Sequence, residues 1–131
     1  MTQIEDIRNR YDEKFQLSEF AEAYQLALEL IKTDPSNFVS YNLAGRALFR
    51  NGDNCNAERY FLIALSICEN NENCLSFLSQ INLNENNFEL TMVYLEKLIK
   101  IKSSYKLEKI RAFIHLYPSC EHAREKIFLM V

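Results

Sequence analysis

The sequence contains only two glycines, and both lie within one stretch, YNLAGRALFRNGDNCNAERYFLIALSI. Gly45 lies inside a segment whose large residues, such as Tyr41 and Leu48, are spaced as on one face of a helix. Gly52 follows that segment, where a helix commonly ends on a residue with positive φ. The stretch therefore predicts two helices that approach closely, with Gly45 and Ala57 supplying small side chains at the contact.

The same pattern of large and small residues recurs when the sequence is shifted by about 34 residues. In the forward direction Gly45 corresponds to Ser79, and in the backward direction Ala57 corresponds to Ala23. The pattern weakens away from the centre. Asn82 and Thr91 depart from it in the third repeat, which indicates a looser helix pair there. In the first repeat Tyr11 stands where the central repeat has Gly45, and a relaxed pattern is expected in a terminal repeat.

The recurrence of these large and small residues about every 34 residues resembles the tetratricopeptide-repeat (TPR) family. The resemblance implies an all-α fold, a right-handed superhelix of antiparallel helix pairs, that is, a TPR-like α-solenoid. We expect a single domain over residues 1–131, with repeats at about 4–37, 38–71 and 72–105 and a divergent terminal helix pair at about 104–131. The helices are expected at residues 4–16, 19–32, 37–50, 54–68, 72–84, 88–101, 104–116 and 119–130.

Charge and hydropathy exclude several classes of partner. The net charge is -3, so no global field draws the chain to nucleic acid or to an anionic membrane. The first residues, MTQIEDIRNRYDEK, carry acids where a targeting segment needs bases and an apolar run. No apolar stretch approaches the length of a membrane span. The sequence therefore predicts a cytoplasmic protein without a nucleic-acid or membrane partner.

The sequence carries no pattern typical of catalysis or of cofactor binding. It has no glycine-rich phosphate loop and no HExxH or GxSxG motif, so we expect no enzyme activity and no cofactor. The four cysteines include no CxxC pair and are expected to be reduced thiols. His115, Cys120 and His122 are the one possible metal cluster, but they straddle Pro118, where one helix is expected to stop, so we expect no metal site. Lysines between residues 97 and 111 are expected to be solvated surface, which leaves RNA binding a minor alternative.

The resemblance also indicates a binding surface, because the first helix of each repeat in this family lines a concave groove. Arginines suit the carboxylates of a bound peptide or helix, and aromatic side chains supply apolar anchors. Arg46 and Arg50 lie four residues apart and are expected on the same face. An ordinary solvated helix face is the alternative interpretation. The residues expected to face the groove are Arg8, Asp12, Asn42, Arg46, Phe49, Arg50, Ser76, Phe77, Gln80 and Asn84.

One known use of this fold is the carboxylate clamp, which grips the acidic carboxyl-terminal tails of Hsp70 and Hsp90 chaperones. The positions of this sequence that match the clamp residues are Arg8, Asp12, Leu43, Asn73 and Phe77. Only Arg8 keeps the charge that the clamp needs. The resemblance therefore does not extend to that ligand.

The sequence thus favours a noncatalytic protein–protein interaction module that binds a peptide or helix in a concave groove. Two alternatives stay open: a TPR-type secretion chaperone for a type III system, and the amino-terminal assembly or dimerisation domain of a larger protein. The carboxyl end bears on the second of these. Phe128, Leu129 and Val131 fall outside the inward pattern of the last expected helix, so we expect self-association there, through a homodimer, or cover from a following segment.

Overall fold

The structure, a computed structural model, describes residues 2–101. That part of the chain forms six α-helices and no strand, which confirms the all-α helical repeat. Each helix begins and ends within one residue of its expected range, and the expected helices at 104–116 and 119–130 lie outside the described residues. The six are α1 (Gln3–Gln16), α2 (Phe20–Thr33), α3 (Phe38–Arg50), α4 (Asn54–Ile67), α5 (Glu72–Asn84) and α6 (Phe88–Ile101).

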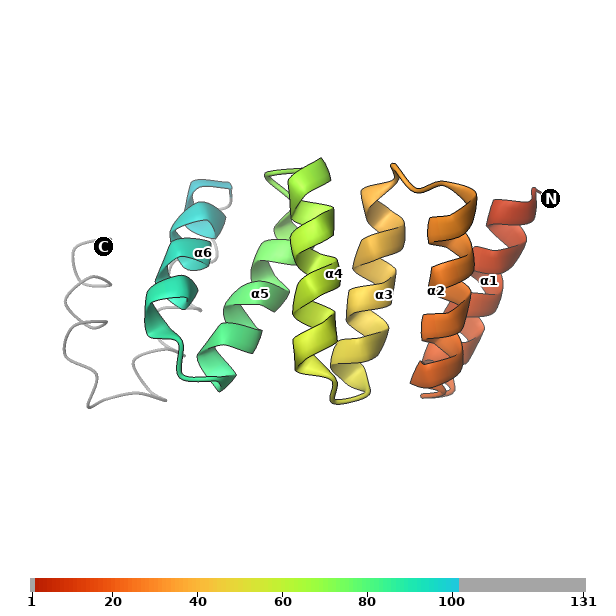
Figure 1. The fold of residues 1–131 in the computed structure, drawn as a ribbon, viewed down its shortest axis with the longest axis horizontal. Coiled ribbons are helices and arrows are strands. Elements are labelled where there is room, and N and C mark those ends of the chain that lie inside the picture. Colours follow the sequence, from red (N-terminus) through yellow and green to blue (C-terminus); the bar gives the residue numbers. More distant parts are fainter. Residues whose placement is uncertain (1, 102–131) are drawn as a thin grey trace. The chain divides into compact units, whose positions relative to one another are not determined.

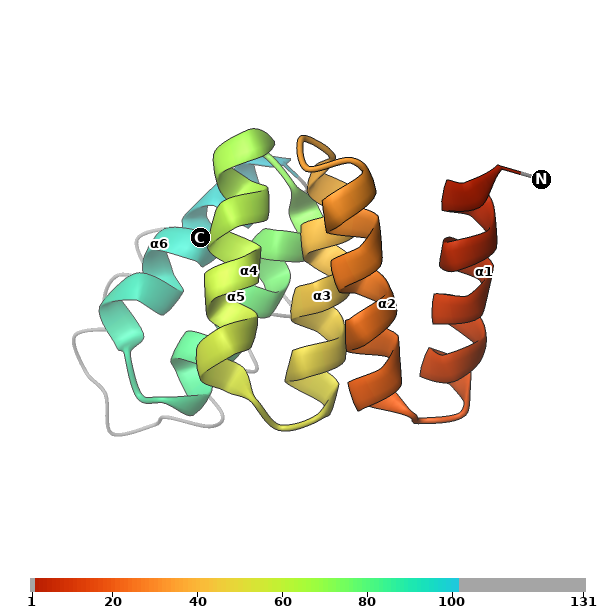
Figure 2. The same cartoon turned by 45° about the vertical axis from the view of Figure 1, so that its right-hand side comes forward.

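The chain divides into two compact units, Met1–Cys74 and Leu75–Val131, and each is described by itself. The first unit holds α1 to α4 and the first residues of α5. Its helices run alternately in opposite directions and are joined by short turns at alternate ends (Figures 1 and 2). The single domain that the sequence predicts stays a prediction.

Small residues at the helix contacts let the four helices of the first unit approach closely. Ala23 and Ala27 of α2 and Ala44 of α3 are fully buried. Gly45 of α3 faces the ring of Phe61 on α4, and a Cβ atom added to Gly45 would lie 2.8 Å from that ring. The close α3–α4 contact that Gly45 and Ala57 predicted is therefore present, and Gly45 is required by the approach rather than by its backbone angles.

Local backbone signals set the helix ends. Gly52 follows α3 with φ +85°, a conformation that favours glycine. The side-chain oxygen of Asn37 accepts from the Val39 N–H at 3.0 Å and begins α3, and Asp53 accepts from the Asn56 N–H at 3.2 Å and begins α4. Each cap satisfies an amide that the helix itself leaves unpaired, which fixes where the helices start.

In the second unit the two polar departures from the repeat pattern are buried. The Asn82 amide donates to the Leu78 carbonyl at 2.8 Å, and the Thr91 hydroxyl donates to the Asn87 carbonyl at 2.8 Å. Each side chain thus donates a hydrogen bond within one turn of its own chain segment, which offsets part of the cost of its burial. The looser helix pair expected from these residues stays a prediction. Among residues 2–101, no helix is long and apolar enough to cross a bilayer.

Candidate partner-binding site

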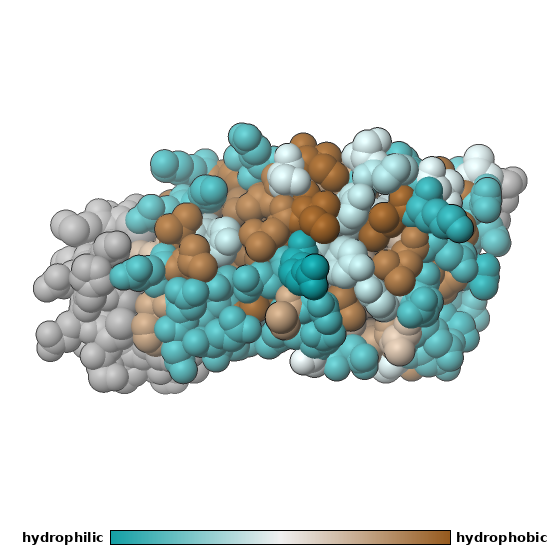
Figure 3. Space-filling view, in the orientation of Figure 1, coloured by the Kyte–Doolittle hydropathy of each residue, from teal (hydrophilic) through white to brown (hydrophobic). Residues whose placement is uncertain are grey.

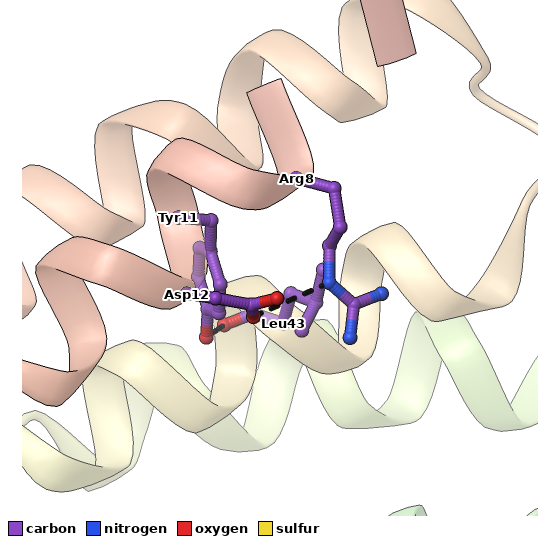
Figure 4. Close-up of polar contacts among 4 residues, drawn as sticks. All are labelled: Arg8, Tyr11, Asp12 and Leu43. Carbon is purple, nitrogen blue, oxygen red and sulfur yellow. Dashed lines mark hydrogen bonds and ion pairs between the residues drawn. The ribbon is translucent and has the colours of Figure 1, made fainter. Parts of the chain in front are cut away.

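Tyr11 fixes α1 against α3 in the first unit (Figure 4). Its side chain is 1% exposed, and its hydroxyl donates to the Leu43 carbonyl at 2.7 Å. Burial raises the pKa of Tyr11 above its usual value, so the hydroxyl stays neutral and remains a donor. Tyr11 stands where the central repeat has Gly45, a departure from the pattern that is expected in a terminal repeat. The structure has a specific polar contact at that position.

We expect Tyr11→Phe to lower the free energy of unfolding by about 1 to 2 kcal/mol, because it removes a buried hydrogen bond. Urea denaturation measures the change, and Tyr41→Phe is the control, since its hydroxyl bond to the Pro35 carbonyl is exposed.

The raised pKa of Tyr11 also makes the stability of the protein depend on pH. The contribution of the neutral Tyr11 hydroxyl to the free energy of unfolding is complete below about pH 10 and falls as the pH rises through the raised pKa. The wild type should therefore lose stability above about pH 10 more steeply than Tyr11→Phe; equal slopes in the two proteins would contradict the buried contact.

Two arginines of α3 lie over aromatic rings contributed by α1 and α2. The guanidinium carbon of Arg46 is 4.5 Å from the ring centroid of Phe15. The guanidinium carbon of Arg50 is 5.8 Å from the Phe15 centroid and 5.4 Å from the Phe20 centroid. Both arginines are exposed, and each distance is within the range of a cation–π contact. Arg46 and Arg50 therefore lie side by side on one face, as their spacing suggested.

The Phe15 ring is held from two sides. It stacks on Tyr11 with ring centroids 5.8 Å apart, and Phe20 meets it edge to face at 5.1 Å. Sequence reasoning missed Phe15 and Phe20 as site residues. One signal was present, because Phe15 follows Tyr11 by four residues and so lies on the same face of its helix.

Arg8 and Asp12, both expected to face the groove, are paired with each other on α1 (Figure 4). The Arg8 Nε atom lies 3.5 Å from an Asp12 carboxylate oxygen, and the two side chains are 42% and 52% exposed. A surface pair of this kind contributes little to stability. It does, however, offset the charge that either residue would present to a ligand.

The other expected site residues have mixed surroundings. The Asn42 side-chain oxygen accepts from the Cys74 thiol, whose pKa burial raises to about 12, helped by Cys68, so the thiol stays a donor. Phe49 is half-buried. Four of the expected residues belong to the part of α5 in the second unit: Ser76 and Phe77 are half-buried, and Gln80 and Asn84 are exposed. The role of all these residues in binding stays a prediction.

The acidic side chains at the α1–α2 turn are bound to a lysine. Lys14 Nζ lies 2.9 Å from a carboxylate oxygen of Glu19 and 2.9 Å from one of Glu22. These bonds, the one to Glu19 first, raise the pKa of Lys14, and Lys14 in turn lowers the pKa of Glu22. Within residues 2–101 no carboxylate forms an ion pair with Arg46 or Arg50. Arg46 and Arg50 contact the rings of Phe15 and Phe20 instead.

A second exposed surface lies on α4 and was not predicted from the sequence. Leu62, Ile63 and Ile67 are 42%, 42% and 43% exposed, and apolar surface is visible over this helix (Figure 3). These three side chains give α4 an exposed apolar surface. In the part of the chain that the structure describes, no group of three histidine, cysteine or acidic residues could hold a metal ion. The candidate metal residues His115, Cys120 and His122 lie outside it.

Comparison with protein-family models gives no match, and neither does comparison with curated proteins. Solved structures do match. The first TPR of Spaghetti (RPAP3), bound to the HSP90 peptide SRMEEVD, superposes with a TM-score of 0.80 at 15% identity, over 89% of this chain and 94% of the neighbour. The first TPR domain of the human RPAP3 protein gives a TM-score of 0.75 at 16% identity, over 89% of this chain and 96% of that domain. The MamA RS-1 ArsTM double mutant gives a TM-score of 0.77 at 16% identity, over 97% of this chain and 74% of the neighbour. The chain therefore has the tetratricopeptide-repeat fold.

Proposed function

We propose that this chain is a noncatalytic protein-interaction module that binds an acidic peptide or helix of another protein on its α1–α3 face. This face is the surface of the first unit that carries Arg8, Asp12, Phe15, Asn42, Arg46 and Arg50. Its helices are folded before binding, so the ligand bears most of the ordering cost.

The observation that carries the proposal is the pair of exposed guanidinium groups of Arg46 and Arg50. They lie over one aromatic ring, and no carboxylate within residues 2–101 pairs with either. Arginine binds carboxylates through two parallel N–H donors, which gives both affinity and orientation. Three acidic side chains of the α1–α2 helix pair, Asp12, Glu19 and Glu22, are already paired with Arg8 or Lys14. An external acidic ligand is the partner that this arrangement favours.

The RPAP3 neighbour is bound to a peptide that ends in EEVD, so the fold is compatible with an acidic peptide ligand. That particular ligand does not carry over to this chain. Of the positions that correspond to the carboxylate clamp only Arg8 is basic, and Arg8 is paired with Asp12. The charge that could bind a carboxylate lies further along α3 instead, at Arg46 and Arg50. The proposed ligand is therefore an acidic segment with a different binding position.

Selection of a random displayed peptide library on the full chain tests this function and does not depend on the identity of the natural partner. We expect the selected peptides to be enriched in Asp and Glu and their affinity, measured by fluorescence anisotropy, to fall as salt is raised. The double variant Arg46→Gln with Arg50→Gln should lose these peptides, while Arg59→Gln, an exposed arginine of α4, should keep them.

Peptides without acidic enrichment, or peptides that the double variant still binds, would contradict the proposal. In the second case binding lost on Leu62→Ser with Ile63→Ser would assign the partner to the α4 surface. The secretion chaperone and the assembly domain are not favoured by any contact in the described residues. Self-association through Phe128, Leu129 and Val131 stays a separate proposal, because these residues lie outside the described part of the chain.

A further inference from the structure

We propose that Phe15 is a positioning residue, whose ring orders the guanidinium groups of Arg46 and Arg50 for a pair of ligand carboxylates. The inference rests on the proposed function, and it adds the role of one residue and the spacing of the ligand's acids, which the proposed function leaves open. Its basis is geometric. The same ring lies 4.5 Å from the Arg46 guanidinium carbon and 5.8 Å from that of Arg50, and all three residues belong to the first compact unit.

An aromatic ring under a guanidinium group changes what the group can bind. The ring covers one face of the planar cation, so the N–H donors at its edge remain open and point within one plane. A free arginine side chain has many rotamers and loses that freedom when a ligand binds. Ordering it in advance removes part of this loss, so the ordered arginine binds more tightly than a free one with the same charge.

The shared ring also brings the two positive charges together. The two guanidinium carbons lie 4.5 and 5.8 Å from one centroid, so they are no farther apart than about one Debye length, roughly 10 Å at 0.1 M salt, and their repulsion is only partly screened. A ligand with two carboxylates close together offsets both charges at once. Carboxylates on neighbouring turns of a helix, or on adjacent residues of an extended segment, meet this requirement. The favoured ligand is therefore a peptide with clustered acidic residues rather than one with a single acid.

Phe15 is itself well fixed, as a positioning residue must be. Tyr11 stacks on one side of the ring and is anchored by its own hydrogen bond to Leu43, while Phe20 meets the ring edge. The turn between α1 and α2 is held by Lys14, which binds two carboxylates of the turn and of α2. The ring is thus fixed by contacts within the chain itself, so we expect the arginines to be ordered in the free protein.

The first measurement needs no ligand. In the free full chain, with arginine side chains labelled for NMR, the Nε–Hε resonances of Arg46 and Arg50 should be shifted by the ring current of Phe15. Phe15→Leu should move them toward the values of an exposed arginine such as Arg59. Wild-type resonances already at those values would overturn the inference, because the ring would then not order the side chains.

The second measurement follows the same resonances while the blocked peptide tetraglutamate is added at low salt. We expect Phe15→Leu to weaken binding by about fivefold or more, and Arg46→Lys to do the same, because lysine keeps the charge but lacks the planar guanidinium group. Phe15→Tyr keeps a ring and should retain affinity. Phe38→Leu, a half-buried phenylalanine at the start of α3, is the matched control for a smaller apolar side chain. Circular dichroism and the melting temperature establish that each variant is folded.

The outcomes separate the inference from the proposed function. If tetraglutamate binds the wild type and Phe15→Leu equally, Phe15 does not position the arginines and only the inference fails. If Arg46→Lys binds as well as the wild type, charge alone suffices and the inference fails in the same way. If tetraglutamate does not bind the wild type at all, acidic recognition at this face is wrong and both fail. A blocked tetrapeptide with one glutamate and three glutamines should bind more weakly than tetraglutamate; equal affinity would overturn the paired-carboxylate pattern.

Discussion

Replacement of Gly45 with leucine is expected to lower the free energy of unfolding by about 2 to 3 kcal/mol, because the site has no room for a side chain. Even a Cβ atom would lie 2.8, 2.9 and 3.0 Å from three carbons of the Phe61 ring, and Phe61 is 0% exposed. Chemical denaturation followed by circular dichroism measures the change. For a chain of this length the melting temperature should fall by about 10 °C. An unchanged melting temperature would contradict the close α3–α4 contact.

Two effects oppose each other at this position, and alanine separates them. Alanine favours a helix over glycine by about 1 kcal/mol, whereas its Cβ atom requires the buried Phe61 ring to move. We expect the steric effect to be the larger, so Gly45→Ala should destabilise the protein by up to about 1 kcal/mol, less than leucine does. With Phe61→Leu in the same chain the cost of Gly45→Ala should shrink, because the clashing ring is gone. If the destabilisation by Gly45→Ala is the same with and without Phe61→Leu, the clash does not involve the Phe61 ring.

Gly52→Ala is the control for the loss of a glycine as such. Nothing lies within 4 Å of a Cβ atom at Gly52, but its φ of +85° strains any other residue. The cost should be about 1 to 2 kcal/mol and should not depend on Phe61. The two glycines of the chain are therefore needed for different physical reasons, one for space and one for backbone conformation.

The helices could be predicted from the sequence because their signals are local and repeat. Small residues such as Gly45 and Ala57 recur at one period with large ones between them, and that pattern is a property of helix contacts. The ends were predictable because caps such as Asn37 and Asp53 act on amides two or three residues away. The contact of Tyr11 was not predicted, because its signal is not local. Its buried hydroxyl is satisfied by a carbonyl on another helix, which no local pattern records.

The candidate site could be predicted only in part. The four-residue spacing of Arg46 and Arg50 was enough to place both on one face. The ring beneath them comes from Phe15, near the end of α1 and thus separated from α3 by the whole of α2. A second ring comes from Phe20, the first residue of α2. Which ring meets which arginine depends on the angle between α1 and α3, and the sequence alone does not determine that angle. The ordered guanidinium pair is therefore a result of tertiary packing.

Reversal of both arginine charges, Arg46→Glu with Arg50→Glu, is expected to weaken binding of an acidic peptide by at least about 100-fold. A hydrogen bond to a charged group contributes about 1.5 to 3 kcal/mol, so the loss of two corresponds to two powers of ten or more in affinity. The fold should survive, because both side chains are exposed and each cation–π contact contributes only about 0.5 to 1 kcal/mol. Fluorescence anisotropy with the selected acidic peptides measures the affinity, and circular dichroism measures the helix content.

The matched control is Arg10→Glu with Arg59→Glu, two exposed arginines of α1 and α4 that stack on no ring among residues 2–101. Both double variants change the net charge by the same amount, so general repulsion of an acidic peptide affects them equally. A site at Arg46 and Arg50 predicts a large loss in one variant and a small, salt-sensitive loss in the other. It also predicts that the reversed site gains affinity for lysine-rich peptides, because the glutamates now complement them. Equal losses in the two variants would mean that the overall charge governs binding and that the α1–α3 face holds no specific site.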